Sequence, residues 1–479
     1  MEQYKLPSHN NSDKVFIVNR SELEGRIDPY FFKKEFDVIS DKLSHIETLP
    51  LKKVSVKIFS GITPLSGGDS YTDRENGIAF IRSGDYSEDN IIDFSSTNYI
   101  TTSVHNGIMS SSKIKKGDLL IAIVGATIGK VGIYNYDEEA NINQAICAIR
   151  LKEQFIPEFI HIYLLTALGQ KILDRLKRPV ARANINLEEI SSIQIPQITR
   201  TRQKEVVDFY YNKIDLKQQK EAEAKALLDS IDNYLLGELG ITLPEKDDSL
   251  QKRVFTAQFS EIGGGRLDPL SLKNNISDFL TGKYKEKKIK EIALNFKSGF
   301  GAGKQDQVLD DSGIIQIRPT NIDEQGTLKF DKNVYLPVDN SYNGSDFINV
   351  DDILFNNTNS QEWVGKTAIL KEQQQLLFSN HITKIVVNKE VAVPDYIWLI
   401  LNSYQKNKIF YSICTNWNNQ SGVGLDLLRS LPIPIPPLEK QNEIAQHIQS
   451  LREQAKQLQN DAKAILEQAK KDVEQMILG

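Results

Sequence analysis

The pentapeptide GRIDP at residues 25–29 returns as GRLDP at residues 265–269 of a 479-residue chain. A Gly-Arg-aliphatic-Asp-Pro sequence has little reason to occur twice by chance, and a repeat that is overlooked leads to a wrong architecture. The two halves of the chain are therefore expected to be copies of one unit.

Further pairs of segments match in the same order along the two halves. They pair residues 77–100 with 313–336, 115–134 with 349–370, 156–165 with 393–401, and 187–206 with 425–444. Single residues also coincide: Arg82 with Arg318, Lys130 with Lys366, and Asn143 with Asn380. A shared order at a nearly constant spacing indicates a duplication.

Each copy follows the same sequence of elements. Short β-rich segments with turn residues come first, then a helix after Pro157 or Pro394, then an Ile-Pro strand edge and a long charged helix. This order predicts an α+β fold with two tandem duplicated domains, separated and followed by long helices. The expected parts are a polar tail at 1–14, a first domain at 15–198, a central spacer helix with linker at 199–245, a second domain at 246–436 and a C-terminal spacer helix at 437–479.

The spacer helices carry heptad stripes over about 200–239 and 437–478. The stripes that we expect to pair the helices, and to dock partners, contain Val207, Ile214, Leu228, Leu235, Ile444, Leu451, Leu458 and Ile465. A second seam on the last helix carries small residues, including Ala455, Ala462 and Ala469, which allow a close approach of two backbones. We expect an antiparallel coiled coil with one domain at each end of a rod of roughly 60 Å. The alternative is that each helix packs on its own domain.

Composition excludes several classes of protein. No apolar run of about 18 residues occurs and the N-terminus is polar, so we expect a cytoplasmic protein without membrane contact. The two cysteines, Cys147 and Cys414, lack metal-ligand spacing and are expected to be buried thiols; no metal is expected. The net charge of −5 still permits a local basic face that binds nucleic acid.

Segments that resemble catalytic motifs lack residues that those motifs require. GATIGK at 125–130 has too few residues between its glycines for a phosphate loop, and in SGFGAGKQD at 298–306 a glutamine replaces the hydroxyl residue. The Pro-Pro-aromatic segment of an amino-methyltransferase is missing, as are nuclease, zinc-protease and serine-hydrolase signatures. We expect no catalytic residue on this chain.

Polar and basic residues at turns of both copies are the remaining candidates. Arginine suits guanine, asparagine and glutamine suit adenine, and lysine suits phosphate. The candidate DNA-binding residues are Arg82, Lys130, Asn143, Gln144, Arg178, Arg182, Arg318, Lys366, Asn380, His381 and Asn418. The arginines of the pentapeptides, Arg26 and Arg266, are instead expected to pair with Asp28 and Asp268 or a nearby carbonyl.

These features resemble the specificity subunit of type I restriction-modification systems. The resemblance rests on the two pentapeptides, on KKGDLLIAIVGATIGKVGIY with NINQAICAIRL, and on the segments NINLEEISSIQIPQITRTRQKEV and LRSLPIPIPPLEKQNEI that enter the long helices. It covers nearly the whole chain beyond the N-terminal tail. Residues such as NNTNSQEWVGK in the second half differ from AIVGATIGK in the first, as two different DNA targets would require.

The resemblance implies a function for each part. Each half would be a target-recognition domain for one part of a split, asymmetric sequence in double-stranded DNA, and the helices would set the gap. The subunit would bind two methyltransferase (M) subunits, which hold S-adenosylmethionine and methylate adenine, while this chain holds no cofactor. Motor-nuclease (R) subunits would complete the complex. The alternatives are the recognition subunit of a two-subunit type II restriction-methylation enzyme and a coiled-coil scaffold without a DNA role.

Overall fold

A computed structural model of the chain describes residues 17–18, 20, 23, 26–65, 69–86, 92–178, 183–243, 256, 282–308, 312–339, 341–417 and 420–479. It divides into two compact units, Met1–Glu221 with Gln459–Gly479 (unit 1) and Ala222–Leu458 (unit 2). The pentapeptide at 265–269, Arg182 and Asn418 lie outside the described residues.

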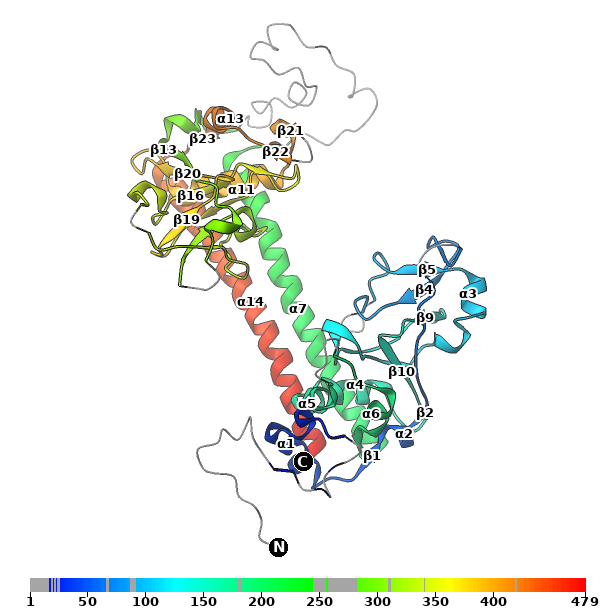
Figure 1. Cartoon of the computed structure of the whole chain (residues 1–479). Helices are drawn as coiled ribbons and strands as arrows, with labels where there is room; N and C mark the ends of the chain where they lie inside the picture. Colours follow the sequence, from blue (N-terminus) through cyan, green and yellow to red (C-terminus); the bar gives the residue numbers. More distant parts are fainter. Residues whose placement is uncertain are drawn as a thin grey trace. The chain divides into compact units, whose positions relative to one another are not determined.

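Unit 1 is built on two small sheets (Figure 1). The first has the strand order β2-β10-β7-β8, all antiparallel, with β2 at Ser55–Ser60, β10 at Ile146–Leu151, β7 at Leu119–Ala122 and β8 at Val131–Ile133. The second has the order β3-β5-β4-β9-β6, with β3 at Tyr71–Thr72, β5 at Asn98–Ile100, β4 at Ile78–Ile81, β9 at Ala140–Ile142 and β6 at Lys113–Ile114. Strands β4 and β9 are parallel, and a separate pair joins β1 (Thr48–Pro50) to β11 (Gln194–Pro196).

Unit 2 repeats this arrangement. Its four-stranded sheet has the order β13-β20-β16-β18, with β13 at Ala293–Ser298, β20 at Ile382–Val387, β16 at Ile353–Asn356 and β18 at Thr367–Ile369. The parallel pair recurs as β14 (Ile314–Ile317) and β19 (Leu376–Phe378), beside β15 (Tyr335–Leu336), and the separate pair recurs as β12 (Glu286–Lys288) and β23 (Pro432–Pro434). A third sheet of order β17-β22-β21 joins Thr358–Asn359, Gln420–Gly422 and Thr415–Trp417.

Two pairs of equivalent residues confirm the duplication at atomic detail. Gly61 and Gly299 follow β2 and β13, and a Cβ atom there would lie 1.9 Å from the Ile142 carbonyl oxygen or 2.1 Å from that of Phe378. Only glycine allows the backbones to approach so closely.

The second pair is Gln203 and Gln441, which are both buried. The Gln203 side chain accepts a hydrogen bond from the Ile156 backbone at 3.2 Å, and that of Gln441 accepts one from Val393 at 2.8 Å. Each glutamine therefore ties its long helix to the segment that precedes the Pro157 or Pro394 helix.

One detail of the expected alignment is wrong by a residue. The backbone N–H of Asn143 donates to Ile81, and the corresponding bond in unit 2 is made by Ser379 with Ile317. Asn143 therefore matches Ser379, and Gln144 matches Asn380. The alignment was placed by the asparagine that both segments contain, whereas the structure aligns them by the turn that follows β9 and β19.

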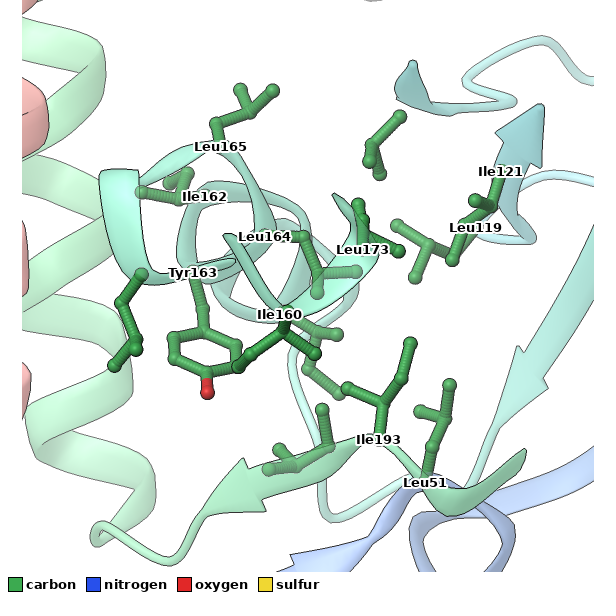
Figure 2. Close-up of a cluster of buried hydrophobic side chains, with 14 of the residues drawn as sticks. Leu51, Leu119, Ile121, Ile160, Ile162, Tyr163, Leu164, Leu165, Leu173 and Ile193 are labelled. Carbon is green, nitrogen blue, oxygen red and sulfur yellow. The ribbon is translucent and has the colours of Figure 1, made fainter. Parts of the chain in front are cut away.

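The core of unit 1 lies between the first sheet and two helices, α4 (Pro157–Leu165) and α5 (Ala167–Leu176). Residues from Phe159 to Leu165 are all buried, because this part of α4 is apolar or aromatic on every side apart from His161. Figure 2 shows Ile160 and Leu164 of α4 on the side that faces β7 and the segment around Ile193. In unit 2 the corresponding helices are α11 (Pro394–Lys406) and α12 (Ile409–Ile413), and the short helices α6 (Leu187–Ser192) and α13 (Leu425–Ser430) complete the match.

The long helices are α7 (Arg200–Leu239) and α14 (Leu438–Leu478), close to their predicted bounds. In unit 1 the start of α7 shares a core with the end of α14, and Lys220 pairs with Asp461 at 3.2 Å. In unit 2 the end of α7 shares a core with the start of α14, and Lys440 pairs with Glu238 at 2.6 Å. The predicted antiparallel pairing is thus confirmed within each unit.

The expected helix seams need a correction. The fully buried stripe of α14 is the small one, Ile448, Ala455, Ala462 and Ala469. Of the predicted stripes, Ile214, Leu235 and Ile444 are buried, and Val207, Leu228, Leu451, Leu458 and Ile465 are half-buried. The small residues are buried because close backbone approach requires them. The alternative, in which each long helix packs only on its own domain, is wrong, because the hydrophobic core of each unit contains residues from both α7 and α14.

Candidate nucleic-acid interface

Arg26 of the first pentapeptide is a structural residue. Its side chain is 7% exposed, and the guanidinium donates to Asp28 at 2.8 Å, to Glu189 at 2.8 Å and to the Leu176 carbonyl at 3.0 Å. Burial is the largest single influence on the pKa of Asp28 and would raise it, but the hydrogen bond and charge of Arg26 and the backbone N–H of Phe31 together lower this pKa. The pentapeptide therefore ties the beginning of unit 1 to α5 and α6, as expected for Arg26.

Arg82 and Arg318 also hold the backbone around them. Arg82 follows β4 and donates to Asp85 at 3.0 and 3.1 Å and to the Ser96 carbonyl at 2.9 Å. The hydrogen bonds to Asp85 raise the pKa of Arg82. Arg318 follows β14 and donates to Gln316 at 3.0 Å and to the Ala302 carbonyl at 3.1 Å. Both guanidinium groups thus brace the loops that leave the parallel strand pair.

The two candidate lysines lie against aromatic rings. Lys130 is 5.2 Å from the Tyr86 ring centre, and Lys366 is 4.8 Å from that of Trp363. Lys366 also donates to the Ile322 carbonyl at 2.8 Å, and its burial lowers its pKa. Their positive charges are partly withdrawn from solvent, which weakens them as phosphate contacts.

The turns after β9 and β19 carry the most accessible candidates. Asn143 is half-buried and accepts a hydrogen bond from the Ala145 backbone at 3.2 Å, so its side chain closes the turn. Gln144 and Asn380 are exposed at equivalent positions, and Gln144 contacts Thr63. His381 is half-buried beside Asn380. Two exposed amides on equivalent tight turns can present a donor and an acceptor together, as adenine requires.

Arg178 lies at a position where the two units carry different side chains. Its guanidinium donates to Glu189 at 2.9 and 3.0 Å, so Arg26 and Arg178 share one carboxylate. The bridge of Arg178 with Asn184 corresponds to the pairing of Thr415 with Gly422 in unit 2. A charged position in unit 1 is therefore uncharged in unit 2.

Beside Thr415 lies a hollow of about 300 Å³ that the sequence did not predict. It is lined by uncharged residues only, among them Ser298, Asn357, Thr383 and Trp417. Trp417 is 46% exposed, and its ring lies beside Gly422, where a Cβ atom would come within 2.5 Å of it. An aromatic residue among the amides of CTNWNNQSG was the available signal.

The expected absence of catalytic loops and metal clusters can be examined in the described ranges. Residues 125–127 form a short turn between β7 and β8 rather than the start of a long helix, and 298–306 leave the end of β13 in the same way. Phosphate loops need a helix N-terminus, so neither segment has the required geometry. Among the residues that the structure describes, no His, Cys, Asp and Glu side chains gather into a metal site. Cys147 and Cys414 are buried thiols, and burial raises the pKa of Cys147 to about 12.

None of the described helices is long and apolar enough to cross a membrane. This finding covers only the residues that the structure describes.

Comparison with known proteins gives a consistent result. The model of the type I restriction modification DNA specificity domain matches residues 66–226 and again 281–468. The chain is 36% identical over 97 residues to the putative type I restriction enzyme MjaX specificity subunit of Methanocaldococcus jannaschii, a match that covers 20% of this chain and 23% of that protein. It is also 36% identical over 97 residues to the type I restriction enzyme EcoBI specificity subunit of Escherichia coli, covering 20% of each. These matches span about a fifth of the length of either relative.

A solved structure supports the fold alone. It comes from work on complex assembly and conformational transition of the type I R-M system, and it matches with a TM-score of 0.52 at 12% identity over 90% of this chain and 96% of that chain. Because the family model matches most of the chain, in two copies, this protein belongs to the family of type I restriction modification DNA specificity domains.

Proposed function

We propose that this chain is the sequence-specific DNA-recognition subunit of a type I restriction-modification complex. Each half would read one part of a split, asymmetric target in double-stranded DNA. The observation that carries the proposal is the duplication: two units share one strand order but present different side chains at Arg178 and Thr415. Two similar scaffolds with different surfaces fit the task of reading two different sequences.

The proposed contacts fall into two groups. Gln144 and Asn380 are the base-edge candidates, because both are exposed amides on equivalent turns. Arg82 and Arg318 would brace the segments around the ends of β4 and β14 and supply their remaining N–H groups to DNA. Exposed lysines would add salt-dependent affinity through phosphates. Arg182, His381 and Asn418 stay candidates from the sequence.

The partners follow from the same proposal. Two methyltransferase subunits would dock on the chain and carry S-adenosylmethionine, and motor-nuclease subunits would complete the complex. This chain would contribute no catalytic residue, and it would act in the cytoplasm, where genomic DNA is accessible. The proposed parts are a tail at 1–14, target-recognition domains at 15–198 and 246–436, and spacers at 199–245 and 437–479.

Detection of methylated adenine by single-molecule sequencing tests the proposal. The genome of a host that expresses this chain with its cognate methyltransferase is compared with that of a host lacking only this chain. A split motif that is methylated only in the presence of the chain is the expected result. If the methyltransferase is folded and bound to the chain but no new methylation appears, the recognition role is wrong.

A further inference from the structure

A β-bulge occurs at the same place in both units. Strands β2 and β13 are equivalent edge strands of their four-stranded sheets. The pairing of β10 with β2 skips Val56, and the pairing of β20 with β13 skips Leu294. A bulge adds one unpaired residue and redirects its side chain.

The two bulge residues are both aliphatic and exposed. Val56 is 67% exposed and Leu294 is 69% exposed. Large apolar side chains that are more than 60% exposed in the described ranges are Ile27, Val56, Leu65, Ile108, Leu294 and Val338. Within the part of the chain that the structure describes, Val56 and Leu294 are the pair from this set that occupies equivalent positions.

A single exposed aliphatic residue needs no explanation, but an exposed aliphatic residue at the same position of two diverged copies does need one. Edge strands are usually protected from association by charged residues or by bulges that turn the strand away. Here the bulge itself carries the aliphatic side chain outward. The feature has been kept in both units although their candidate DNA-contacting positions differ, so its ligand should be common to the two halves.

We infer that Val56 and Leu294 are the centres of two equivalent docking surfaces, each for one copy of the same protein partner. An aliphatic centre favours a protein surface over DNA phosphates. Lys52 and Lys290 are exposed four residues before each bulge and make no ion pair among the described residues. The fitting partner surface is therefore an apolar patch with an acidic rim. This inference rests on the proposed function, under which the partner is the methyltransferase subunit.

The stoichiometry of the complex tests the docking surfaces. The full-length chain is co-expressed with its cognate methyltransferase, and native mass spectrometry counts the methyltransferase copies bound to wild type, Val56→Asp, Leu294→Asp and the double variant. A buried carboxylate without a partner opposes docking. Each single variant should lose one of two copies and the double variant both, with a dissociation constant raised on the order of tenfold or more at each altered surface.

Two matched controls make the test specific. Ile108→Asp in unit 1 and Val338→Asp in unit 2 place the same charge at aliphatic residues that are 62% and 71% exposed but lie outside strands β2 and β13. They should keep both copies. Retention of both copies by the double variant, or an equal loss in the controls, would overturn the docking surfaces. A wild-type chain that binds no methyltransferase would instead overturn the proposed function, and the docking surfaces with it.

Folding defects are separated by a milder pair of variants. Val56→Thr and Leu294→Thr remove apolar area without adding charge, and threonine is favoured in strands. If the aspartate variants lose the hydrogen-exchange protection of β10 or β20, their sheets are disturbed, and the threonine variants then serve as the test of docking. They should weaken docking while leaving that protection unchanged, and unchanged docking would overturn the inference.

Discussion

We expect His161 to make unit 1 sensitive to acid at a position where unit 2 has a tryptophan. It lies on α4 at the position that Trp398 occupies on α11, where the indole donates to the Thr367 carbonyl at 2.9 Å. His161 is 1% exposed, and neither ring nitrogen makes a hydrogen bond of ordinary geometry. Burial lowers the pKa of His161 to about 4, although the backbone of Val131 acts in the opposite direction.

The sign of the effect follows from the direction of this shift. An unfolded histidine has a pKa of about 6.5, so the unfolded chain takes up a proton before the folded chain does. The free energy of unfolding is therefore unaffected by His161 above about pH 6.5. It decreases as the pH falls from there toward about 4, because the unfolded chain binds the proton more strongly. Between about pH 7 and about pH 5 the free energy of unfolding of unit 1 should fall by about 2 kcal/mol from this residue alone.

The assay has to follow the two units separately. Trp363, Trp398 and Trp417 all lie in unit 2, so indole fluorescence reports on that unit. Unit 1 can be followed by urea unfolding with pulsed hydrogen exchange of α4 peptides at both pH values. His161→Leu should remove most of the pH dependence, while Trp398→Leu, a matched change without titration, should leave the pH dependence of unit 2 unaltered. An equal pH dependence of unit 1 in wild type and His161→Leu would refute the reasoning.

Four further predictions concern the two units and the long helix α7. Gly365→Ala should destabilise unit 2 by about 3 kcal/mol or more, because φ is +89° and the new Cβ would lie 2.2 Å from the Phe410 ring. Gly129→Ala should destabilise unit 1 by only about 1–2 kcal/mol, because φ is +88° but the atom nearest to the new Cβ lies 3.8 Å away. Urea unfolding measures the loss of stability in both glycine variants, and equal losses would contradict the steric argument. Arg26→Met should destabilise unit 1 by about 3–5 kcal/mol, which hydrogen exchange of α6 measures, since it leaves a buried carboxylate with less compensation. Inserting four residues into α7, which lengthens it by about 6 Å, should change the gap between methylated half-sites and leave the half-sites unchanged; altered half-sites would contradict the modular proposal.

Much of the fold could be predicted because a duplication provides its own alignment. Glycine positions such as Gly129 and Gly365 and the Pro157 and Pro394 helix starts are fixed by backbone geometry, so they recur in both copies. The long helices could be placed because no proline interrupts them and their apolar residues recur every seven positions.

The packing of those helices was harder to predict. From a heptad pattern, large apolar residues are expected to be the most buried, whereas the fully buried stripe of α14 consists mainly of alanines. Which seam is buried depends on what lies opposite, and the first core includes Ala469 and Val473 beside Tyr210. A sequence pattern of one helix contains no information about that neighbour.

The candidate site was the least predictable part, for a reason that lies in the duplication itself. Coincidence between the halves selects residues such as Arg82 with Arg318, and both make hydrogen bonds that brace equivalent loops. A residue kept in both copies serves what the copies share, which is the scaffold and any common partner. Two domains that read different sequences must differ where they touch bases. Contact residues should therefore be sought where the side chains diverge on the same framework, as at Arg178 and Thr415 or at Gln144 and Asn380. Val56 and Leu294 are alike in position and exposure, as the proposed docking of one common partner on each unit requires.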